Sequence, residues 1–250
     1  MNIDFHVIIP ARYQSSRLPG KLLMELDGVS ILERVYLQAK KSNPKSIIIA
    51  TDTKEIMAHA ASFGARAILT SIDHQSGTDR IAEVISLENY AKDDIIVNVQ
   101  GDEPFIAPEL ISQVALSIAS SDASMATLCW PIENIDMCSN PNIVKVVRDK
   151  ADNALYFSRS VIPFNRDEKE NIEHIYRHIG LYAYKASFLK NLVTLPVCRL
   201  EAIEALEQLR VLWNGYKIKV DLACVPPLQD INTADDLEKA KLHLDKNFSH

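Results

Sequence analysis

The sequence lacks long apolar runs and contains little cysteine. No apolar run approaches the ~20 residues that a membrane-spanning helix needs. The cysteines have no CxxC spacing, so they indicate reduced thiols rather than a disulfide framework or a zinc site. They are Cys129, Cys138, Cys198 and Cys224. The first residues, MNIDFH, are polar and acidic and do not form a signal-peptide pattern. We therefore expect a soluble, cytoplasmic protein.

The chain also has no excess of positively charged residues over negatively charged ones. The chain has 27 Lys and Arg against 33 Asp and Glu, a formal net charge of −6. This balance excludes a global attraction to nucleic acid or to an anionic membrane, so any anion-binding site must be local. The length of 250 residues suits one large α/β domain or two small ones.

Several common catalytic motifs are missing. The sequence has no GxGxxG and no GxxxxGK[ST], which excludes a dinucleotide fingerprint and a P-loop. It has no GxSxG nucleophile elbow. His174 and His178 are four residues apart, but they flank a predicted strand and no HExxH is present. A zinc site at these histidines is therefore disfavoured.

The first half of the chain alternates apolar runs with amphipathic segments. Strands are predicted at 5–10, 46–50, 66–69 and 94–99, and helices at 31–41, 54–63, from the turn at 74–79 to about 88, and 108–119. Ser30 and Glu33 have the spacing of a capping box, and Pro108 suits a first helical turn. The order predicts an α/β fold, a Rossmann-like doubly wound and mainly parallel sheet with right-handed crossovers.

The second half is less regular. Strands are predicted at 125–129, 143–148, 154–157, 180–184 and 217–223, a charged loop at 165–173, and helices at 200–213 and 234–244. Thr233 and Asp236 resemble a capping pair for the last helix. No repeat, low-complexity tract or linker divides the chain. We expect a single domain over residues 1–250, with an inserted smaller lobe at about 130–215.

A basic loop follows the first predicted strand. The segment VIIPARYQSSRLPGK carries Arg12, Ser15, Arg17 and Lys21 around a Pro-Gly turn. Because ligands bind beyond the carboxyl ends of strands in open α/β sheets, these cations suit a polyanion such as a triphosphate. A solvated loop with scattered charges explains the same residues equally well.

Two acids follow the predicted strand at 94–99. Asp102 and Glu103 come directly after it, and a carboxylate at such a place is a good Mg²⁺ ligand. Since both this segment and the basic loop end parallel strands, they can converge on one cleft. The alternative is that the acids only form a turn before the next helix.

A third group of polar residues lies near the C-terminal part of the predicted lobe. Glu204, Glu207 and Gln208 share a predicted helix with Leu206 and Leu209. A solvated helix face would have the same composition. The residue types alone therefore leave the role of this group open.

Six longer segments add a family resemblance. They are IIPARYQSSRLPGK (8–21), DHQSGTDRIAEV (73–84), VNVQGDEP (97–104), ALYFSRSVIPFNRD (154–167), RHIGLYAY (177–184) and LEQLRVLWNG (206–215). Together they resemble 3-deoxy-manno-octulosonate cytidylyltransferases, the CMP-Kdo synthetases of Gram-negative bacteria. The match runs through nearly the whole chain in the same order, and several of the motifs are long and unusual.

The resemblance implies a fold, a reaction and an assembly. It implies the nucleotide-diphospho-sugar transferase type of α/β fold and a homodimer, with the inserted lobe contributing to the sugar pocket and the dimer contact. It also implies a Mg²⁺-dependent reaction of CTP with 3-deoxy-D-manno-octulosonate (Kdo), which gives CMP-Kdo and pyrophosphate for lipopolysaccharide biosynthesis. Four apolar residues of the irregular region are candidates for the dimer contact: Val161, Ile162, Phe164 and Leu192.

The resemblance also assigns roles to residues. Those implied for the nucleotide are Arg12, Ser15, Lys21, Ser76, Gly77, Arg80 and Asp102. Those implied for the sugar are Gln100, Arg159, His178, Tyr182, Glu207 and Gln208. The catalytic set is Arg12, Lys21 and Asp102, in which the cations orient the phosphates and screen their charge. Asp102 is the leading Mg²⁺ ligand, and Arg159 suits the sugar carboxylate.

One position departs from the family pattern. The family carries an Asp in a D-T-P-x-D-L stretch as a second metal ligand, whereas this chain has Asn232 at that place. An asparagine offers a carbonyl oxygen without charge. If the segment is extended, Asp230 points to the same side and can supply the missing charge.

Three other functions remain open. One is a cytidylyltransferase for a related sugar acid, such as 8-amino-Kdo or a sialic-acid-like sugar. Another is a nucleotide-binding protein with reduced catalysis because of Asn232. A glycosyltransferase of similar fold is less favoured, since no Asp-x-Asp motif follows the strand that ends at Val99.

Overall fold

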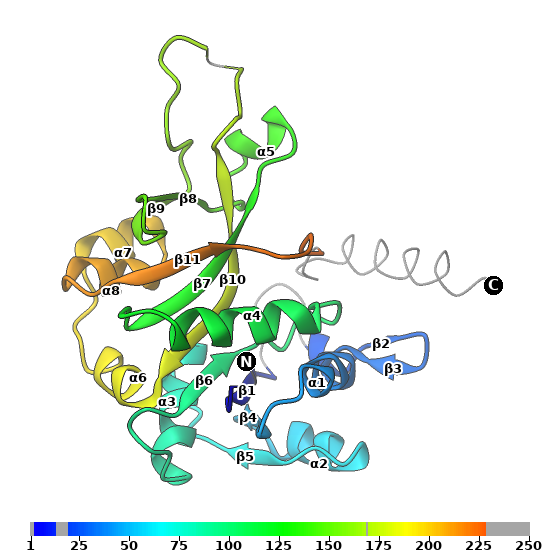
Figure 1. Ribbon diagram of the computed structural model, residues 1–250. Coiled ribbons are helices and arrows are strands. Elements are labelled where there is room, and N and C mark those ends of the chain that lie inside the picture. The colour runs from blue at the N-terminus through cyan, green and yellow to red at the C-terminus, as the bar shows by residue number, and fades with distance from the viewer. Residues whose placement is uncertain (1–2, 14–19, 169, 229–250) are drawn as a thin grey trace.

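The computed structural model describes residues 3–13, 20–168 and 170–228 (Figure 1). The strands are β1 (His6–Ala11), β2 (Glu25–Leu26), β3 (Val29–Ser30), β4 (Ser46–Thr51), β5 (Ala67–Leu69), β6 (Ile95–Asn98), β7 (Met125–Pro131), β8 (Lys145–Arg148), β9 (Ala154–Ser158), β10 (Tyr176–Lys185) and β11 (Ile218–Leu222). The helices are η1 (Lys21–Leu23), α1 (Ile31–Lys41), α2 (Lys54–Ser62), α3 (Gly77–Leu87), α4 (Pro108–Ala119), α5 (Ile135–Ser139), α6 (Ala186–Leu192), α7 (Arg199–Glu204) and α8 (Gln208–Trp213). None of the helices in these ranges is long and apolar enough to cross a membrane.

The central sheet is mainly parallel, as the alternation of elements predicted. Its strands run in the order β11-β7-β10-β6-β1-β4-β5. β1 pairs in parallel with β4 and β6, β4 with β5, and β7 with β11. Only β10 runs against its neighbours β6 and β7 in this order. The predicted α/β fold class is therefore confirmed, with one antiparallel strand inside the sheet.

Helices cover both faces of the sheet because its strands are apolar on both sides. In β1, Val7 and Ile9 belong to an apolar cluster that also contains side chains of α1, α2 and α4, whereas Ile8 between them belongs to a cluster with side chains of α3, α6 and α8. All three side chains are fully buried. A strand that is apolar at every position belongs in the middle of such a layered structure, and Figure 1 shows α4 lying across one face.

Local signals in the sequence explain where the helices begin. The Ser30 hydroxyl accepts a hydrogen bond from the Glu33 amide at 3.1 Å and caps α1. Ser76 and Asp79 form a reciprocal capping box at the start of α3. α4 begins at Pro108, whose missing N–H is not needed there. The predicted starts of α1 and α4 are thus confirmed.

The predicted helix at 200–213 is two helices. Ala205 adopts a left-handed conformation, with φ 50° and ψ 50°, and ends α7. α8 then starts at Gln208, so Glu207 lies in the connection rather than on a helix face. Periodicity misses the break because Leu206 in the connection and Leu209 in α8 are both buried, as residues on one helix face would be. The predicted helix at 234–244, with Thr233 and Asp236, lies outside the described residues.

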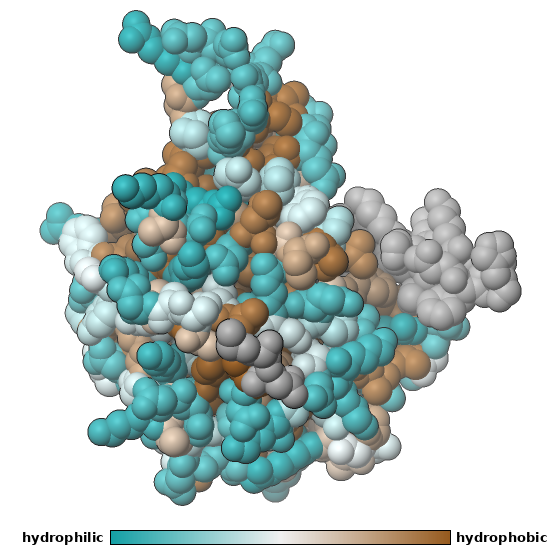
Figure 2. Space-filling view, in the orientation of Figure 1, coloured by the Kyte–Doolittle hydropathy of each residue, from teal (hydrophilic) through white to brown (hydrophobic). Residues whose placement is uncertain are grey.

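A projection rises from one end of the sheet. β8 and β9 pair with each other, and β8 pairs with the first residues of β10 (Figure 1). The rest of β10 belongs to the central sheet, although it falls within the predicted lobe at 130–215. Figure 2 shows that the outer end of the projection is hydrophilic, while apolar side chains gather nearer its base. The division into one domain and an inserted lobe remains a prediction.

Candidate active site

Two segments that are far apart in the sequence meet at the carboxyl ends of β1 and β6. Ile8 pairs with Asn98, so the chain leaves both strands at the same sheet edge. Gly101 then passes directly beside β1, where an added Cβ would lie 2.9 Å from the Pro10 carbonyl oxygen. Only glycine permits this close approach without a backbone shift. The contact fixes Gln100 and Asp102 beside the loop that follows β1.

Lys21 and Asp102 form an ion pair at this edge. Lys21 Nζ lies 2.7 Å from Asp102 Oδ2. The lysine side chain is 7% exposed and the carboxylate 31% exposed. Gly20, with φ 68°, turns the chain into η1 and directs Lys21 inward. A buried ammonium beside a more open carboxylate suits phosphate oxygens and a hard cation together.

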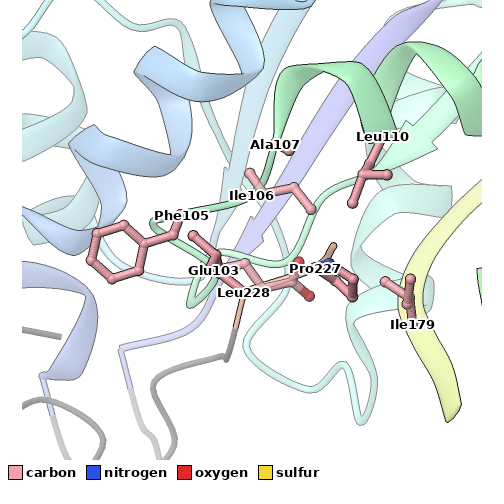
Figure 3. A pocket seen from close by; sticks show the side chains of 8 residues that line it. All are labelled: Glu103, Phe105, Ile106, Ala107, Leu110, Ile179, Pro227 and Leu228. Atoms are coloured by element: carbon pink, nitrogen blue, oxygen red, sulfur yellow. The ribbon is translucent and has the colours of Figure 1, made fainter. Parts of the chain in front are cut away.

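Glu103 has different surroundings from its neighbour Asp102. Its carboxylate lies among Phe105, Ile106 and Leu228, around a cavity of ≈ 20 Å³ (Figure 3). Glu103 is 8% exposed. Asp102, which pairs with Lys21, is the acid that was proposed from the sequence as the metal ligand.

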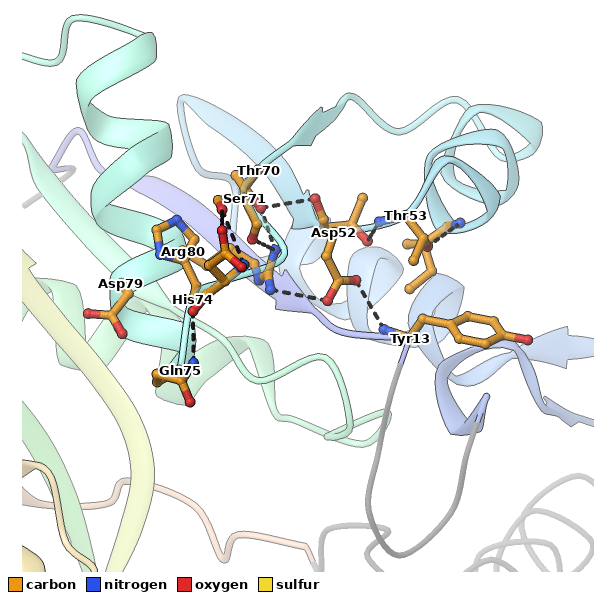
Figure 4. Close-up of polar contacts among 12 residues, drawn as sticks. Tyr13, Asp52, Thr53, Thr70, Ser71, His74, Gln75, Asp79 and Arg80 are labelled. Atoms are coloured by element: carbon orange, nitrogen blue, oxygen red, sulfur yellow. Dashed lines mark hydrogen bonds and ion pairs between the residues drawn. The ribbon is translucent and has the colours of Figure 1, made fainter.

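Arg80 lies in the first turns of α3 and is fully buried. Its guanidinium donates to Thr70 Oγ1 at 2.5 Å, to the Ser71 carbonyl oxygen at 3.3 Å and to Asp52 Oδ2 at 3.2 Å (Figure 4). Burial lowers the pKa of Arg80, and the negative charge of Asp52 opposes that shift. Asp52 therefore holds a positive charge in place inside the molecule.

Arg12 adds a second guanidinium near Arg80. The positive charge of Arg12 repels the positive charge of Arg80 and so contributes to the lowered pKa of Arg80. Arg12 Nη2 and Arg80 Nε are both buried without a hydrogen-bond partner among the described residues. Buried donors normally have an acceptor. Two cationic groups with unused donors at one sheet edge fit a polyanion such as a triphosphate.

Asp52 is a site residue that sequence reasoning missed. Its Oδ2 binds Arg80, and its Oδ1 accepts from the Tyr13 amide at 3.3 Å (Figure 4). It comes directly after β4, at the same sheet edge as the ends of β1 and β6. A polar residue at the carboxyl end of a predicted parallel strand is the signal that could have identified it.

Ser76 and Gly77 lie at the start of α3, close to the end of β1. An added Cβ on Gly77 would lie 3.3 Å from Pro10 Cγ. The Ser76 hydroxyl accepts from the Asp79 amide at 3.0 Å, and the hydroxyl of Thr78, two residues later, donates to Glu207. The structure thus brings these two predicted nucleotide residues to the same edge as Lys21, and Thr78 beside them contacts a residue of the predicted sugar set.

The predicted sugar residues His178 and Tyr182 stack on one face of β10. Their ring centroids are 5.3 Å apart, and Phe157 packs against His178 on its other side. Thr127 Oγ1 lies 3.0 Å from His178 Nε2 and also contacts the Ile179 carbonyl oxygen, where β10 bulges. Burial lowers the pKa of His178 to about 3. The imidazole is therefore neutral near pH 7.

Glu207 lies in the connection between α7 and α8, and Gln208 is the first residue of α8. Burial raises the pKa of Glu207, and a hydrogen bond from the Thr78 hydroxyl opposes the rise. The Glu207 charge in turn raises the pKa of Tyr182, after the larger effect of burial. Gln208 is 4% exposed, and its Nε2 has no partner among the described residues. These groups offer both donors and acceptors for hydroxyl groups.

Gln100 and Arg159 have partners within the protein. Gln100 Nε2 donates to Asn98 Oδ1 at 3.1 Å. The Arg159 guanidinium donates only to carbonyl oxygens in the described part of the chain, those of Glu204 at 2.6 Å, Pro141 at 2.8 Å and Ala205 at 3.3 Å, while its backbone N–H donates to the Glu204 carboxylate at 2.9 Å. Three of its five N–H groups are therefore engaged. The pairing of Arg159 with a sugar carboxylate remains a prediction.

Three further predicted residues, Ser15, Asn232 and Asp230, lie outside the described residues.

His174 is 74% exposed at its side chain, unlike His178, so the two histidines have different surroundings. Over residues 3–13, 20–168 and 170–228, no group of three or more His, Cys, Asp or Glu side chains could hold a metal ion.

Comparisons with known proteins agree with this geometry. The sequence model of the Cytidylyltransferase family matches residues 6–218. The chain is 57% identical over 249 residues to a 3-deoxy-manno-octulosonate cytidylyltransferase of Legionella pneumophila (strain Philadelphia 1), with 100% of both chains covered. It is 50% identical over 244 residues to one from Francisella philomiragia, covering 96% of this chain and 98% of the relative.

Solved structures give the same result. CMP:2-keto-3-deoxy-manno-octonic acid synthetase complexed with CTP matches with a TM-score of 0.91 and 35% identity, covering 98% of this chain and 100% of that chain. 4-Diphosphocytidyl-2C-methyl-D-erythritol synthase matches with a TM-score of 0.66 at 11% identity, covering 98% of this chain and 100% of that chain. At that identity the second match shows a common fold alone.

Proposed function

This chain belongs to the family of 3-deoxy-manno-octulosonate cytidylyltransferases, and we propose that it transfers CMP from CTP to the anomeric hydroxyl of Kdo, releasing pyrophosphate. The observation that carries the proposal is a site with two chemically different halves. Buried cations and Asp102 gather at the ends of β1 and β6, whereas His178, Tyr182 and Glu207 supply aromatic rings and hydrogen-bonding groups on and beside β10. CMP-Kdo is an activated sugar for lipopolysaccharide biosynthesis.

The cationic half suits CTP. Both reactants carry negative charge, so attack on the α-phosphorus requires screening and orientation of the phosphates. Lys21 and Arg12 supply that charge from two sides of the loop after β1. Arg80, held by Asp52, adds a third positive charge from α3. These cations stabilise the charge that moves onto pyrophosphate as the bond to the α-phosphorus breaks.

Mg²⁺ fits the donor set at Asp102. Magnesium is commonly held by one or two carboxylates together with substrate phosphates, and does not need a cage made only of protein. The Asp102 carboxylate is partly exposed and lies next to Lys21, where phosphate oxygens would be held. When bound, the ion would neutralise phosphate charge and lower the pKa of the sugar hydroxyl. Asn232, or Asp230, would be the second protein ligand.

The half of the site beside β10 suits a polyhydroxylated sugar acid. His178 and Tyr182 present aromatic faces and ring polar atoms, while Glu207, Gln208 and Gln100 present oxygens and amides. Because the imidazole stays neutral, His178 can accept as well as donate a hydrogen bond. Arg159, at the edge of this half, would meet the sugar carboxylate with its remaining N–H groups.

We also propose a homodimer contact on the projection. Val161 and Phe164 line a hollow of ≈ 250 Å³ together with Ile135, and Phe164 is 68% exposed. An apolar side chain of that size at an open hollow suits a second copy of the chain. Leu192 does not contribute, because it is 1% exposed and packs in the main core. Light scattering that shows a monomer at micromolar concentration would contradict the dimer.

We propose a cytoplasmic location, where CTP is available and the thiols remain reduced. Over residues 20–168 and 170–228 the four cysteines are free, and Cys129, Cys138 and Cys198 among them are buried.

The test is a reaction of the purified protein with CTP, Kdo and Mg²⁺, in which the product is identified by mass and pyrophosphate release is measured. We expect CMP-Kdo. Faster release with 8-amino-Kdo or a sialic acid than with Kdo would reassign the sugar. CTP binding without turnover at saturating Mg²⁺ would support a nucleotide-binding protein instead, and sugar transfer from a nucleotide sugar would support a glycosyltransferase.

A further inference from the structure

We propose that Thr127 is a positioning residue that fixes the tautomer of His178, so that Nε2 carries the ring proton and Nδ1 accepts a hydrogen bond from a hydroxyl group of the sugar. The last step of the inference rests on the proposed function, in which His178 binds the sugar. Thr127 lies in β7 and was not assigned a role by sequence reasoning. It is completely buried, at 0% exposed, so it acts through His178 and not by contact with the sugar.

The Thr127 hydroxyl has three polar neighbours. Its Oγ1 lies 2.8 Å from the Leu181 carbonyl oxygen, 2.9 Å from the Ile179 carbonyl oxygen and 3.0 Å from His178 Nε2. A threonine hydroxyl has one proton to donate and two lone pairs with which to accept. Because carbonyl oxygens can only accept, two of the three neighbours need that single proton.

The two carbonyl oxygens decide the direction of the contact with His178. If the hydroxyl proton pointed at Nε2, both carbonyl oxygens would face an oxygen lone pair at 2.8 and 2.9 Å with no proton between them. The proton therefore goes to the carbonyl oxygens, and the Thr127 oxygen accepts from the Nε2–H group. A neutral imidazole carries one N–H, so Nδ1 keeps only a lone pair. The low pKa of His178, which results from burial, agrees with a neutral ring.

A bulge in β10 brings all three groups to one hydroxyl. Ile179 pairs with Leu128 and Tyr182 pairs with Thr127, so three steps along β10 correspond to one step along β7. A regular strand rises about 3.3 Å per residue and would separate positions four apart by roughly 13 Å. The ring centroids of His178 and Tyr182 are nevertheless 5.3 Å apart. The irregular backbone thus brings the two rings together, and Thr127 binds two of its carbonyl oxygens.

The other contacts of His178 leave Nδ1 available. Phe157 and Tyr182 pack against the ring with centroids at 5.0 and 5.3 Å, which holds the imidazole plane but does not distinguish its two nitrogens. Nδ1 has no hydrogen-bond partner among the described residues, and the side chain is partly exposed. An accessible lone pair requires a donor, and a sugar hydroxyl is one. A sugar with a carbonyl or ether oxygen at this place could not donate.

NMR measures the tautomer directly and without turnover. In protein labelled with nitrogen-15 in its histidine rings, proton–nitrogen correlation spectra distinguish a protonated ring nitrogen from a bare one, and His178→Gln identifies the signals of His178. Near neutral pH we expect Nε2–H in the wild type and in Thr127→Ser, which keeps the hydroxyl. Thr127→Val keeps the shape and loses the oxygen, so its share of Nδ1–H should increase. An Nδ1–H tautomer in the wild type would overturn the proposal.

Steady-state kinetics test the consequence for the sugar. Without the hydroxyl, Nε2–H loses its acceptor, and the ring no longer presents Nδ1 as an acceptor in every molecule. We expect Thr127→Val to raise KM for Kdo about tenfold, the scale of one lost hydrogen bond, while KM for CTP stays within about twofold. Thr127→Ser should stay close to the wild type.

Ser42→Ala is the matched control. The Ser42 hydroxyl is buried and donates to the Ala39 carbonyl oxygen at 2.7 Å, at the end of α1. Its removal costs a buried bond from a hydroxyl to a carbonyl oxygen, as in Thr127→Val, but no predicted site residue takes part. Circular dichroism and Tm of each variant establish that it is folded before kinetics are compared.

The two proposals fail in different ways. If the unaltered protein makes no CMP-Kdo, the proposed function is wrong, whereas the NMR spectra still decide the tautomer. If it makes CMP-Kdo but Thr127→Val and Ser42→Ala share the wild-type KM for Kdo, the positioning role is wrong. Equal rises in KM for CTP and for Kdo, or a Thr127→Ser variant as impaired as Thr127→Val, would also contradict it, because they would indicate a general loss of packing.

Discussion

Lys21 Nζ lies 2.7 Å from Asp102 Oδ2, although the two residues are 81 positions apart in the sequence. The pair joins the loop after β1 to the loop after β6. It places the main cation and the main anion of the proposed reaction side by side. The lysine is nearly inaccessible to solvent, whereas the carboxylate is partly exposed. A phosphate-bound cation can therefore reach Asp102 from the solvent side while Lys21 keeps its contact with the carboxylate on the buried side.

Lys21→Ala should lower turnover strongly. The substitution removes a buried point charge from the proposed phosphate site, and charge-assisted hydrogen bonds are worth roughly 1.5–3 kcal/mol each. We therefore expect kcat/KM to fall about ten- to a hundredfold. Lys45→Ala is the control, because Lys45 is 60% exposed and lies in a loose pair with Asp4 at 3.8 Å. Unchanged kcat/KM in Lys21→Ala would remove Lys21 from the site.

Asp102→Asn should abolish Mg²⁺-dependent activity and keep the fold. Asparagine has nearly the same volume and still accepts a hydrogen bond from Lys21, so the loop after β6 should hold its shape. It lacks the charge that a hard cation needs. Steady-state rates over a Mg²⁺ series, with circular dichroism as the check on folding, measure the effect. Wild-type rates in this variant would show that Asp102 is not the metal ligand.

Asp52→Asn should destabilise the protein as well as weaken CTP binding. It removes the only carboxylate that contacts Arg80 within the described ranges and leaves a buried guanidinium uncompensated. Breaking such a pair typically costs about 3 kcal/mol or more. We expect a lower Tm and a raised KM for CTP. The matched control is Asp122→Asn, whose exposed pair with Lys217 should leave Tm unchanged; equal Tm values for both variants would contradict the role of Asp52.

The fold was largely predictable because its signals are local. Apolar runs such as that of β4 can only be buried strands, and Ser30 and Pro108 mark helix starts through their own chemistry. The break at Ala205 was not predictable, since nothing but tertiary packing makes a non-glycine residue adopt a positive φ there. The antiparallel direction of β10 likewise depends on how the projection returns to the sheet.

Some residues of the candidate site could be predicted from the sequence, and others could not. Lys21 and Asp102 could be chosen from the sequence because both follow predicted parallel strands. The contact of Thr78 with Glu207 could not, because the two residues lie far apart in the sequence and the sequence context of Thr78 is that of an ordinary helix. Roles that depend on contacts between distant segments need the tertiary structure.

His178 should make stability depend on pH. Burial lowers its pKa in the folded protein to about 3, whereas an unfolded histidine titrates near 6.5. Between these values the unfolded chain binds the proton and the folded one does not, so the free energy of unfolding falls as pH falls below about 6.5. The loss from this one group is at most about 1.4 kcal/mol per pH unit.

Urea unfolding of His178→Gln at pH 4.5 to 7.5 checks this effect. The variant should have a flatter dependence on pH than the wild type. His6, whose pKa is also lowered by burial, contributes in the same direction and remains in both proteins. Parallel curves for the two proteins would show that His178 does not titrate differently on folding.

Asn232→Asp should tighten divalent-ion binding and raise kcat, if the position faces a second metal as the family pattern implies. A unit charge at ~4 Å with an effective dielectric constant of ~20 is worth roughly 4 kcal/mol. Desolvation and competing phosphate oxygens should reduce the gain to about one or two kcal/mol. Calorimetric titration of Mg²⁺ with a non-hydrolysable CTP analogue measures binding apart from turnover.

Asp230 provides the competing explanation. In an extended segment, residues two apart point to the same side, so Asp230 could supply the charge that Asn232 lacks. Asn232→Asp would then change little, and Asp230→Asn would be the damaging substitution. Mg²⁺ titrations of both single variants distinguish these cases. If neither variant alters the Mg²⁺ dependence, this segment holds no catalytic metal, and Asp102 with the substrate phosphates must suffice for the reaction.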